Sequence, residues 1–224
     1  MKKTRVGAVA FVLVLFSSGL ACAQDLSKYR TFSFGAGLAS VSKQVDLNAS
    51  ELQLVHQQPA IIQELTWYPP QSFGTSRAAE PVEKILFSFD NGALYRMLVT
   101  YDSSAIKGLT DEDMIRVVSA KYGVATRPVT DVDFPTNPSY KAAEKVIARW
   151  EDRQFSFSLF RSSVSDTYAI VMFDKRLDAQ AAVSIAESIK LERQEAPEKE
   201  TERVKKEAGD LERQRQKNIE ALRP

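Results

Sequence analysis

Two runs with strand-like alternation flank an Asn-Gly pair, and this is the clearest structural pattern in the chain. Asn91 and Gly92 both tolerate the positive φ angles of a type I′ turn, and such a turn matches the twist of two antiparallel strands. The pattern therefore predicts a β-hairpin over residues 83–102. Alternation places one set of side chains on its buried face: Ile85, Phe87, Phe89, Tyr95, Met97, Val99 and Tyr101.

An amphipathic helix is predicted after this hairpin, over residues 111–122. Thr110 can cap the free amides at the start of the helix, and the acidic residues after it complement the helix dipole. Gly123 suits the position just past the last turn. The buried stripe of this helix is expected to be Met114, Ile115, Val118 and Tyr122.

Shorter apolar runs predict the remaining elements of the domain. After the glycine-containing stretch 35–37, Leu38, Val41 and Val45 recur at helical spacing, which predicts a short helix. Further strands are predicted at residues 29–34, 51–56, 61–67, 145–150, 154–160 and 167–173.

The composition of these runs also indicates where they lie in the sheet. Ser156 and Ser158 alternate with large apolar residues, so they are expected to face solvent. Residues 168–173 are apolar throughout, which is typical of a central strand. Residues 71–80 and 126–141 are rich in helix- and strand-breaking residues and are predicted to be surface loops.

The predicted fold class is α+β, with an antiparallel sheet and helices packed on one face. Residues 99–102 end a strand before a helix, and residues 171–174 do the same. This echo suggests a duplication of a strand-strand-helix unit, which we state as a hypothesis.

The carboxyl-terminal region divides into a last domain helix and a charged tail. Asp178 is expected to cap the helix, and Pro197 is expected to mark a hinge. The globular domain is predicted to span residues 24–191, and residues 192–224 to form a helical or partly disordered tail. The apolar seam of the tail is too thin for a sustained coiled coil. The buried stripe of the domain helix is expected to be Ala182, Val183, Ala186 and Ile189.

The amino terminus has the pattern of an export signal. Basic residues precede the apolar run 6–16, and Ala21-Cys22-Ala23 has the small-x-small form of a cleavage site. We therefore predict a signal peptide over residues 1–23 and a periplasmic or secreted mature chain. The alternative is a lipoprotein acylated at Cys22, although Gly19 lies where a lipobox usually has leucine.

Composition narrows the possible partners and chemistries. The 30 basic and 29 acidic residues nearly balance, and removal of the three basic residues of the signal leaves 27 against 29, a net charge of −2. A concentrated basic face for nucleic acid is therefore not expected. Because the single cysteine would leave with the signal, no disulfide, thiol nucleophile or thiolate metal site is expected in the mature chain.

Residues 35–41, followed by paired strands that include residues 87–94, resemble small envelope modules in which a helix precedes a β-hairpin. These modules include the small outer-membrane-assembly lipoprotein and the β-lactamase-inhibitor-protein-like modules. Gly35 and Val41 match the spacing of their glycine and packing valine, whereas Gly37 replaces their hydroxyl cap. The chain also resembles uncharacterised exported bacterial α+β proteins. The resemblance implies binding or assembly work.

Catalytic, cofactor and metal sites are not expected. The only histidine, His56, lies within a predicted strand, where a structural role is the expected one. The acidic stretches 110–113 and 131–133 lack the spacing and glycine of an EF-hand loop. Capping and loop solvation account for them.

The predicted function is therefore a non-catalytic binding or envelope-assembly module, with a protein or another envelope component as its partner. Trp67 and Tyr68 are the candidate binding surface, because aromatic side chains can form a platform for a peptide or sugar. Oligomerisation through the tail is a further prediction. The alternative is a periplasmic hydrolase that uses carboxylates at strand ends, drawn from Asp90, Asp102 and Asp174.

Overall fold

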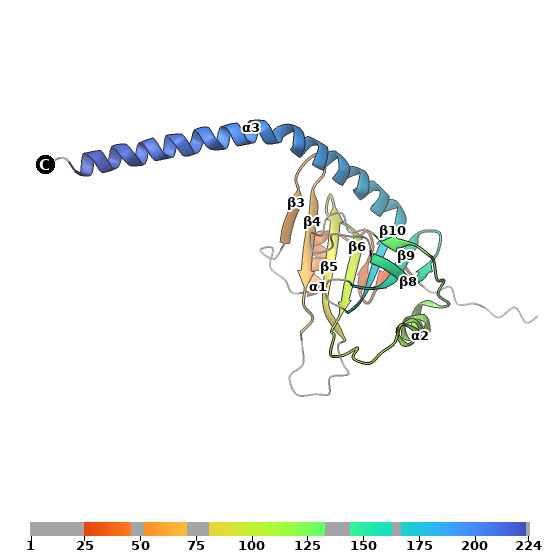
Figure 1. Ribbon diagram of the computed structural model, residues 1–224. Coiled ribbons are helices and arrows are strands. Elements are labelled where there is room, and N and C mark those ends of the chain that lie inside the picture. The colour runs from red at the N-terminus through yellow and green to blue at the C-terminus, as the bar shows by residue number, and fades with distance from the viewer. Residues whose placement is uncertain (1–24, 46–51, 71–80, 133–143, 163–166, 223–224) are drawn as a thin grey trace, which may run out of the picture.

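The computed structural model describes residues 25–45, 52–70, 81–132, 144–162 and 167–222 (Figure 1). It confirms the α+β class, with an eight-stranded antiparallel sheet, a two-stranded sheet and three helices among these residues. The predicted signal peptide with its alternative lipidation site at Cys22, and the predicted loop 71–80, lie outside the described residues.

The helices are α1 (Leu38–Val45), α2 (Asp111–Tyr122) and α3 (Lys175–Ala221). The strands are β1 (Lys28–Tyr29), β2 (Phe32–Ser33), β3 (Leu52–His56), β4 (Ile62–Trp67), β5 (Val82–Asp90), β6 (Ala93–Tyr101), β7 (Asp131–Val132), β8 (Glu144–Glu151), β9 (Phe155–Arg161) and β10 (Tyr168–Asp174).

The large sheet consists of two halves with the same topology. Its strand order is β3-β4-β5-β6-β10-β9-β8-β7, so each half is a four-stranded meander and the last strands of the halves pair at the centre. The helix α1 precedes the first meander, and α2 precedes the second. The repeated unit is therefore a helix followed by four strands.

The predicted hairpin is confirmed as β5 and β6. Asn91 has a φ of 48° and Gly92 a φ of 79°, as a type I′ turn requires. The register shifts after Ser88, so that Phe89 pairs with Leu94. Tyr95 is the extra residue of this bulge, which is why Leu94 takes the place in the main core that simple alternation gave to Tyr95.

One face of the sheet carries the main hydrophobic core and is covered by α1, α2 and the β1–β2 hairpin. Val41 of α1 and Met114 of α2 lie in the same cluster as Phe87, Phe157 and Ile170 from three different strands. The helix α2 has the predicted cap, because the Thr110 hydroxyl accepts from the Asp113 amide while the Asp113 carboxylate accepts from the Thr110 amide. The Trp150 indole donates to the Gly123 carbonyl at 2.9 Å and fixes the end of α2 on the sheet.

The helix α3 lies on the opposite face of the sheet. The predicted packing of the helices on one face therefore holds only for α1 and α2. Arg96 of β6 contacts α3, whereas its neighbour Met97 points into the main core. This placement separates α3 from α2, so a strand-strand-helix repeat is not the unit that the two halves share. Ser156 and Ser158 also face this second side, but both are buried rather than exposed to solvent.

Two boundaries differ from the sequence-based prediction. Asp174, not Asp178, caps α3, since its carboxylate accepts from the Arg176 and Leu177 amides. Within the predicted loop 126–141, residues 131–132 form the edge strand β7 beside β8, and residues 133–141 lie outside the described part.

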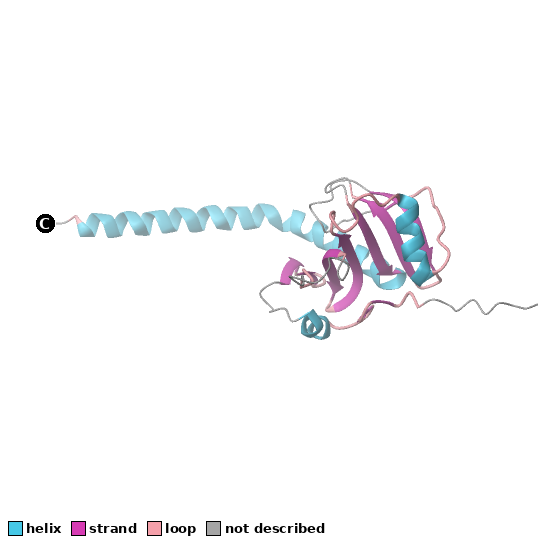
Figure 2. Cartoon of the chain, turned by 90° about the horizontal axis from the view of Figure 1, so that it is seen from below, coloured by secondary structure: helices cyan, strands magenta, loops and turns pink. Residues whose placement is uncertain are grey.

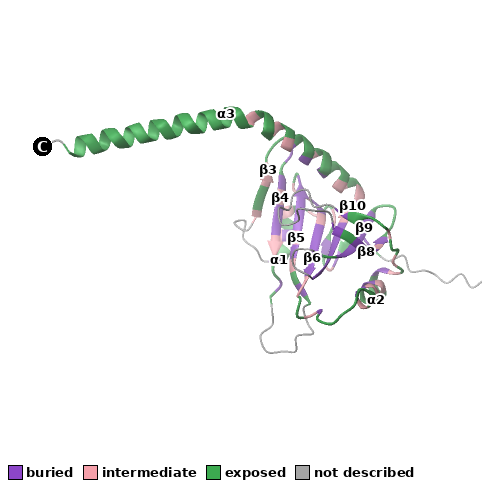
Figure 3. Cartoon of the chain, viewed as in Figure 1, coloured by how far each residue is buried: buried purple, intermediate pink, exposed green. Residues whose placement is uncertain are grey.

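The helix α3 continues without interruption through Pro197, where a hinge was predicted. Its 47 residues correspond to about 70 Å along the helix axis, and Figure 1 shows that the helix bends where it leaves the sheet. We call residues 175–195 the anchored part and residues 196–222 the arm. The arm is exposed at every residue (Figure 3). Figures 1 and 2 both show it running clear of the sheet.

The buried stripe of α3 is not the predicted one. Ala181, Ile185 and Ser188 face the sheet, whereas Val183 is 60% exposed. Ala182 and Ala186 are also exposed, and Ile189 is half-buried. Polar contacts of the first turns with the sheet, from Asp178 to Arg96 and from Gln180 to Asp90, accompany burial of this face.

Candidate functional site

A polar network fixes the anchored part of α3 on the sheet. The Arg96 guanidinium donates two hydrogen bonds to the Asp178 carboxylate, at 2.7 and 2.9 Å, and both side chains are more than four-fifths buried. Gln180 donates to the Asp90 carboxylate at 3.1 Å. Burial raises the pKa of Asp90, and the Gln180 amide opposes this shift in part. This part of the helix is therefore held by specific polar pairs as well as by Ile185.

A second contact lies where α3 passes the outermost strand of the sheet. His56 Nδ1 lies 2.8 Å from a carboxylate oxygen of Glu192, and the His56 side chain is only 11% exposed. The predicted structural role of His56 thus takes the form of a bond between β3 and α3. In Figure 1 the helix passes the upper end of β3 and then runs to the left.

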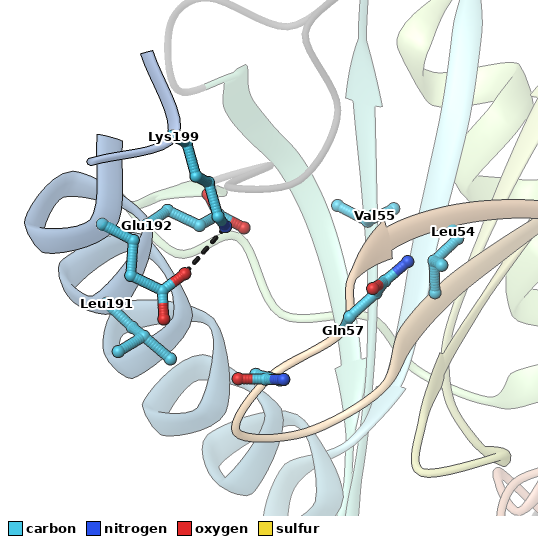
Figure 4. A pocket seen from close by; sticks show the side chains of 8 residues that line it. Leu54, Val55, Gln57, Leu191, Glu192 and Lys199 are labelled. Atoms are coloured by element: carbon cyan, nitrogen blue, oxygen red, sulfur yellow. Dashed lines mark ion pairs between the residues drawn. The ribbon is translucent and has the colours of Figure 1, made fainter. Parts of the chain in front are cut away.

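Beyond this contact, β3 and α3 enclose a pocket of about 410 Å³, which we call the β3–α3 groove. Figure 4 shows α3 side chains on one side of it, and side chains of β3 and its following loop on the other. The Glu195 carboxylate pairs with Lys199 Nζ at 2.7 Å within the α3 wall. The groove is lined by Leu54, Val55, Gln57, Gln58, Leu191, Glu192, Glu195 and Lys199.

The lining of the groove combines polar and apolar side chains. Its lining offers apolar surface from Leu54 and Leu191, amide groups from two glutamines, and carboxylates. Hydroxyl and thiol nucleophiles are absent from this lining, and the nearby His56 ring is bonded to Glu192 through Nδ1. A mainly polar lining with a few apolar side chains, such as Leu54 and Leu191, suits recognition of a ligand or peptide that offers both kinds of contact.

Trp67 and Tyr68 do not form a joint aromatic platform. The Trp67 ring packs edge-to-face against Phe32, with ring centroids 5.7 Å apart, and belongs to the border of the main core. Tyr68 follows the strand and is 63% exposed. Trp67 is partly buried and Tyr68 is exposed, and their role as a binding surface stays a prediction.

The three strand-end carboxylates lie in separate structural settings. Asp90 ends β5 and Asp102 follows β6, which places them at opposite ends of a nine-residue hairpin, about 25 Å apart. Asp102 accepts hydrogen bonds from the Ser104 and Ala105 amides in a turn. Asp174 caps α3 and also accepts from Gln154. Each of the three carboxylates therefore accepts hydrogen bonds that stabilise the fold.

Within the described residues, the structure contains no group of three or more histidine, cysteine, aspartate or glutamate side chains placed to hold a metal ion. None of the helices in this part of the chain combines the length and apolar character needed to span a membrane.

Sequence reasoning missed the β3–α3 groove because its two walls are 136 residues apart at the His56–Glu192 contact. One signal was present: residues 52–58 form a strand-like run without Lys, Arg, Asp or Glu. Edge strands usually carry a charge or proline, and this run lacks both. Position at the edge is a property of the assembled sheet, however, and the run itself does not encode it.

Comparison of the chain with family models, with curated proteins and with solved structures gave no match. The resemblance to small envelope modules therefore stays a prediction.

Proposed function

We propose that this chain is an exported, non-catalytic binding module that acts in assembly at the cell envelope, with a protein as its partner. One observation carries the proposal: a long exposed helix leaves the domain over an open sheet edge and forms a groove with it. The domain holds α3 through Arg96, Asp90 and His56, and this leaves the exposed arm and the groove between β3 and α3 as surfaces for a partner.

The arm supports a binding role because isolated helices gain little stability in water. Most of the stability of a helix in a protein comes from packing of one face, and the arm packs none of its residues on the described domain. Ion pairs along the arm, such as Arg203 with Glu200, are exposed to solvent and therefore add little to the stability of the helix. A partner that packs against the arm would supply the stabilisation that the domain does not give to this helix.

Photo-cross-linking in cells that natively express the chain tests the proposal. A photoreactive amino acid replaces Leu54 in the groove or Leu211 on the arm, and Val117 on α2 is the control because it is similarly exposed on another helix. We expect a discrete protein adduct from position 54 or 211 and none from position 117. Adducts from position 117 alone, or from none of the three positions, would overturn the proposal.

A further inference from the structure

We infer that the β3–α3 groove binds an extended segment of a partner protein, which adds to the sheet as a ninth strand beside β3. This inference rests on the proposed binding function and deepens it by naming the mode and the chemistry of the partner segment. Four features of the described structure carry it: the open edge of β3, the contrast with β7, the groove next to that edge, and the charge of its α3 wall.

The first feature is the unpaired edge. Among the described residues, β3 pairs only with β4, so its other side presents backbone amide and carbonyl groups without a strand partner. Such an edge is a template for another strand. Leu54 is 45% exposed and lies both on this strand and in the wall of the groove.

The second feature is the contrast between the two edges of the sheet. The opposite edge strand, β7, has two residues and begins with Asp131, and short charged edges resist pairing with other chains. The β3 edge has five residues, Leu52–His56, and none is Lys, Arg, Asp, Glu or Pro. The β7 edge is therefore protected by its short length and its charge, whereas the β3 edge is longer and uncharged, and among the described residues only the bulge before His56 and the passing helix α3 limit pairing there.

The third feature is the shape of the open edge. A bulge between Leu54 and His56 bends the strand, and His56 bonds to Glu192 of α3 beyond it. The helix therefore closes one end of the groove. In Figure 1, α3 extends over the space beside the outer edge of β3, where an added strand would lie. A strand in that space would have its end under α3 and one side chain in the pocket of about 410 Å³.

The fourth feature is charge, which defines the partner segment. The α3 wall contributes Glu192, Glu195 and Lys199, which leaves it with one net negative charge. Glu195 is paired with Lys199, and Glu192 contacts His56 through one of its two carboxylate oxygens. The strand wall carries no acidic or basic residue other than the histidine next to it. The chemistry that fits is an uncharged, β-branched strand of about five residues that ends in a basic side chain directed at the α3 wall.

The probe is a defined peptide, acetyl-Val-Thr-Val-Thr-Val-Arg-amide, titrated into the ¹⁵N-labelled mature chain. A matched peptide carries proline in place of the central valine, which removes the amide that a strand ladder needs. We expect the first peptide to shift amide resonances of residues 52–58 and 191–199, and the proline peptide to bind at least tenfold more weakly. Equal binding of the two peptides, shifts confined to other regions, or no shift at 5 mM would overturn strand addition.

Protein variants give a second readout that does not depend on one peptide. Leu54→Lys places a charge on the open edge, and Leu54→Thr is the control that keeps an uncharged residue suited to a strand. We expect Leu54→Lys to weaken peptide binding at least tenfold and Leu54→Thr less than threefold, with unchanged circular dichroism for both. Equal affinities of the two variants would contradict the inference. A cross-link from position 211 that persists in such a case would leave the binding function intact and remove only the strand-addition mode.

Discussion

At the scale of single residues, α3 is held on the sheet by polar side chains that the sequence does not mark as a group. Arg96 and Asp178 are 82 residues apart, and Asp90 and Gln180 are 90 residues apart. The sequence analysis assigned Asp178 to a helix cap and Asp90 to the end of a strand, because a local pattern reveals only local motifs. The tertiary pairs follow from the placement of β6 beside β10, which becomes visible only in the fold.

The Arg96–Asp178 pair is expected to contribute measurably to stability. Arg96→Leu leaves the Asp178 carboxylate largely buried without its cation, and we expect a loss of about 2 kcal/mol in the free energy of unfolding. The double variant Arg96→Leu/Asp178→Leu should recover much of this loss. Urea denaturation measures both. Arg127→Leu is the control, because both side chains of the Arg127–Glu112 pair are more than half exposed, and its loss should cost much less than the loss of Arg96. Equal losses for Arg96→Leu and Arg127→Leu would contradict this assignment.

Asp90 predicts a pH dependence of stability. Burial raises its pKa in the folded state above the usual value of 3.8, so the folded state binds this proton more tightly than the unfolded state does. The ionised carboxylate therefore destabilises the fold above the raised pKa, and this penalty is relieved as the pH falls towards 3.8. We expect Asp90→Asn to be more stable than the wild type at pH 7, with a difference that shrinks on acidification.

Urea denaturation between pH 3.5 and pH 7 checks the sign of this effect. Asp131→Asn, on the exposed edge strand, is the control for the change in net charge. A difference between Asp90→Asn and the wild type that stays constant, or grows as the pH falls, would exclude burial of Asp90 as the cause.

At the scale of elements, strands and helices were predicted well wherever a local signal was strong. The Asn91-Gly92 turn, the Thr110 cap and the apolar run of β10 each specify their element within a few residues. The strands β1 and β2 were predicted as one strand, because the residue that turns the chain between them is Arg30, which adopts a positive φ of 55° without being glycine. The candidate site was not predicted, because its walls meet only in the assembled sheet.

The stripe of α3 shows how a correct helix can be given the wrong buried face. Two apolar stripes at helical spacing exist in the anchored part, and polar docking selects the one that contains Ile185. We expect Ile185→Ala to reduce the free energy of unfolding by about 3 kcal/mol, since it leaves a cavity in a buried contact. Val183→Ala removes a methyl pair from an exposed side chain, and its cost should stay below about 0.5 kcal/mol. Thermal or urea denaturation distinguishes them, and a larger loss for Val183→Ala would favour the predicted stripe over the observed one.

At the scale of the whole molecule, the two halves share a helix and a four-stranded meander, and the asymmetry between them comes from α3. The second half alone continues into this helix, and α3 covers the face of the sheet that α1 and α2 leave free. The same helix then passes the edge of the first half at His56 and Glu192. It therefore connects the central strand β10 with the edge strand β3 before it becomes the arm, which is why the anchored part and the arm should differ in their effect on stability.

Truncation separates these two roles of α3. A chain that ends after Glu202 keeps the His56–Glu192 and Glu195–Lys199 contacts, and its free energy of unfolding should match that of the full mature chain within about 0.5 kcal/mol. A chain that ends after Leu191 loses both contacts and should be less stable by about 1 kcal/mol. Tryptophan fluorescence in urea at low micromolar concentration measures both, so that association does not contribute. Equal stability of the two truncated chains would show that the His56–Glu192 and Glu195–Lys199 contacts do not stabilise the domain. A large loss of stability on truncation after Glu202 would show that the arm packs on the domain.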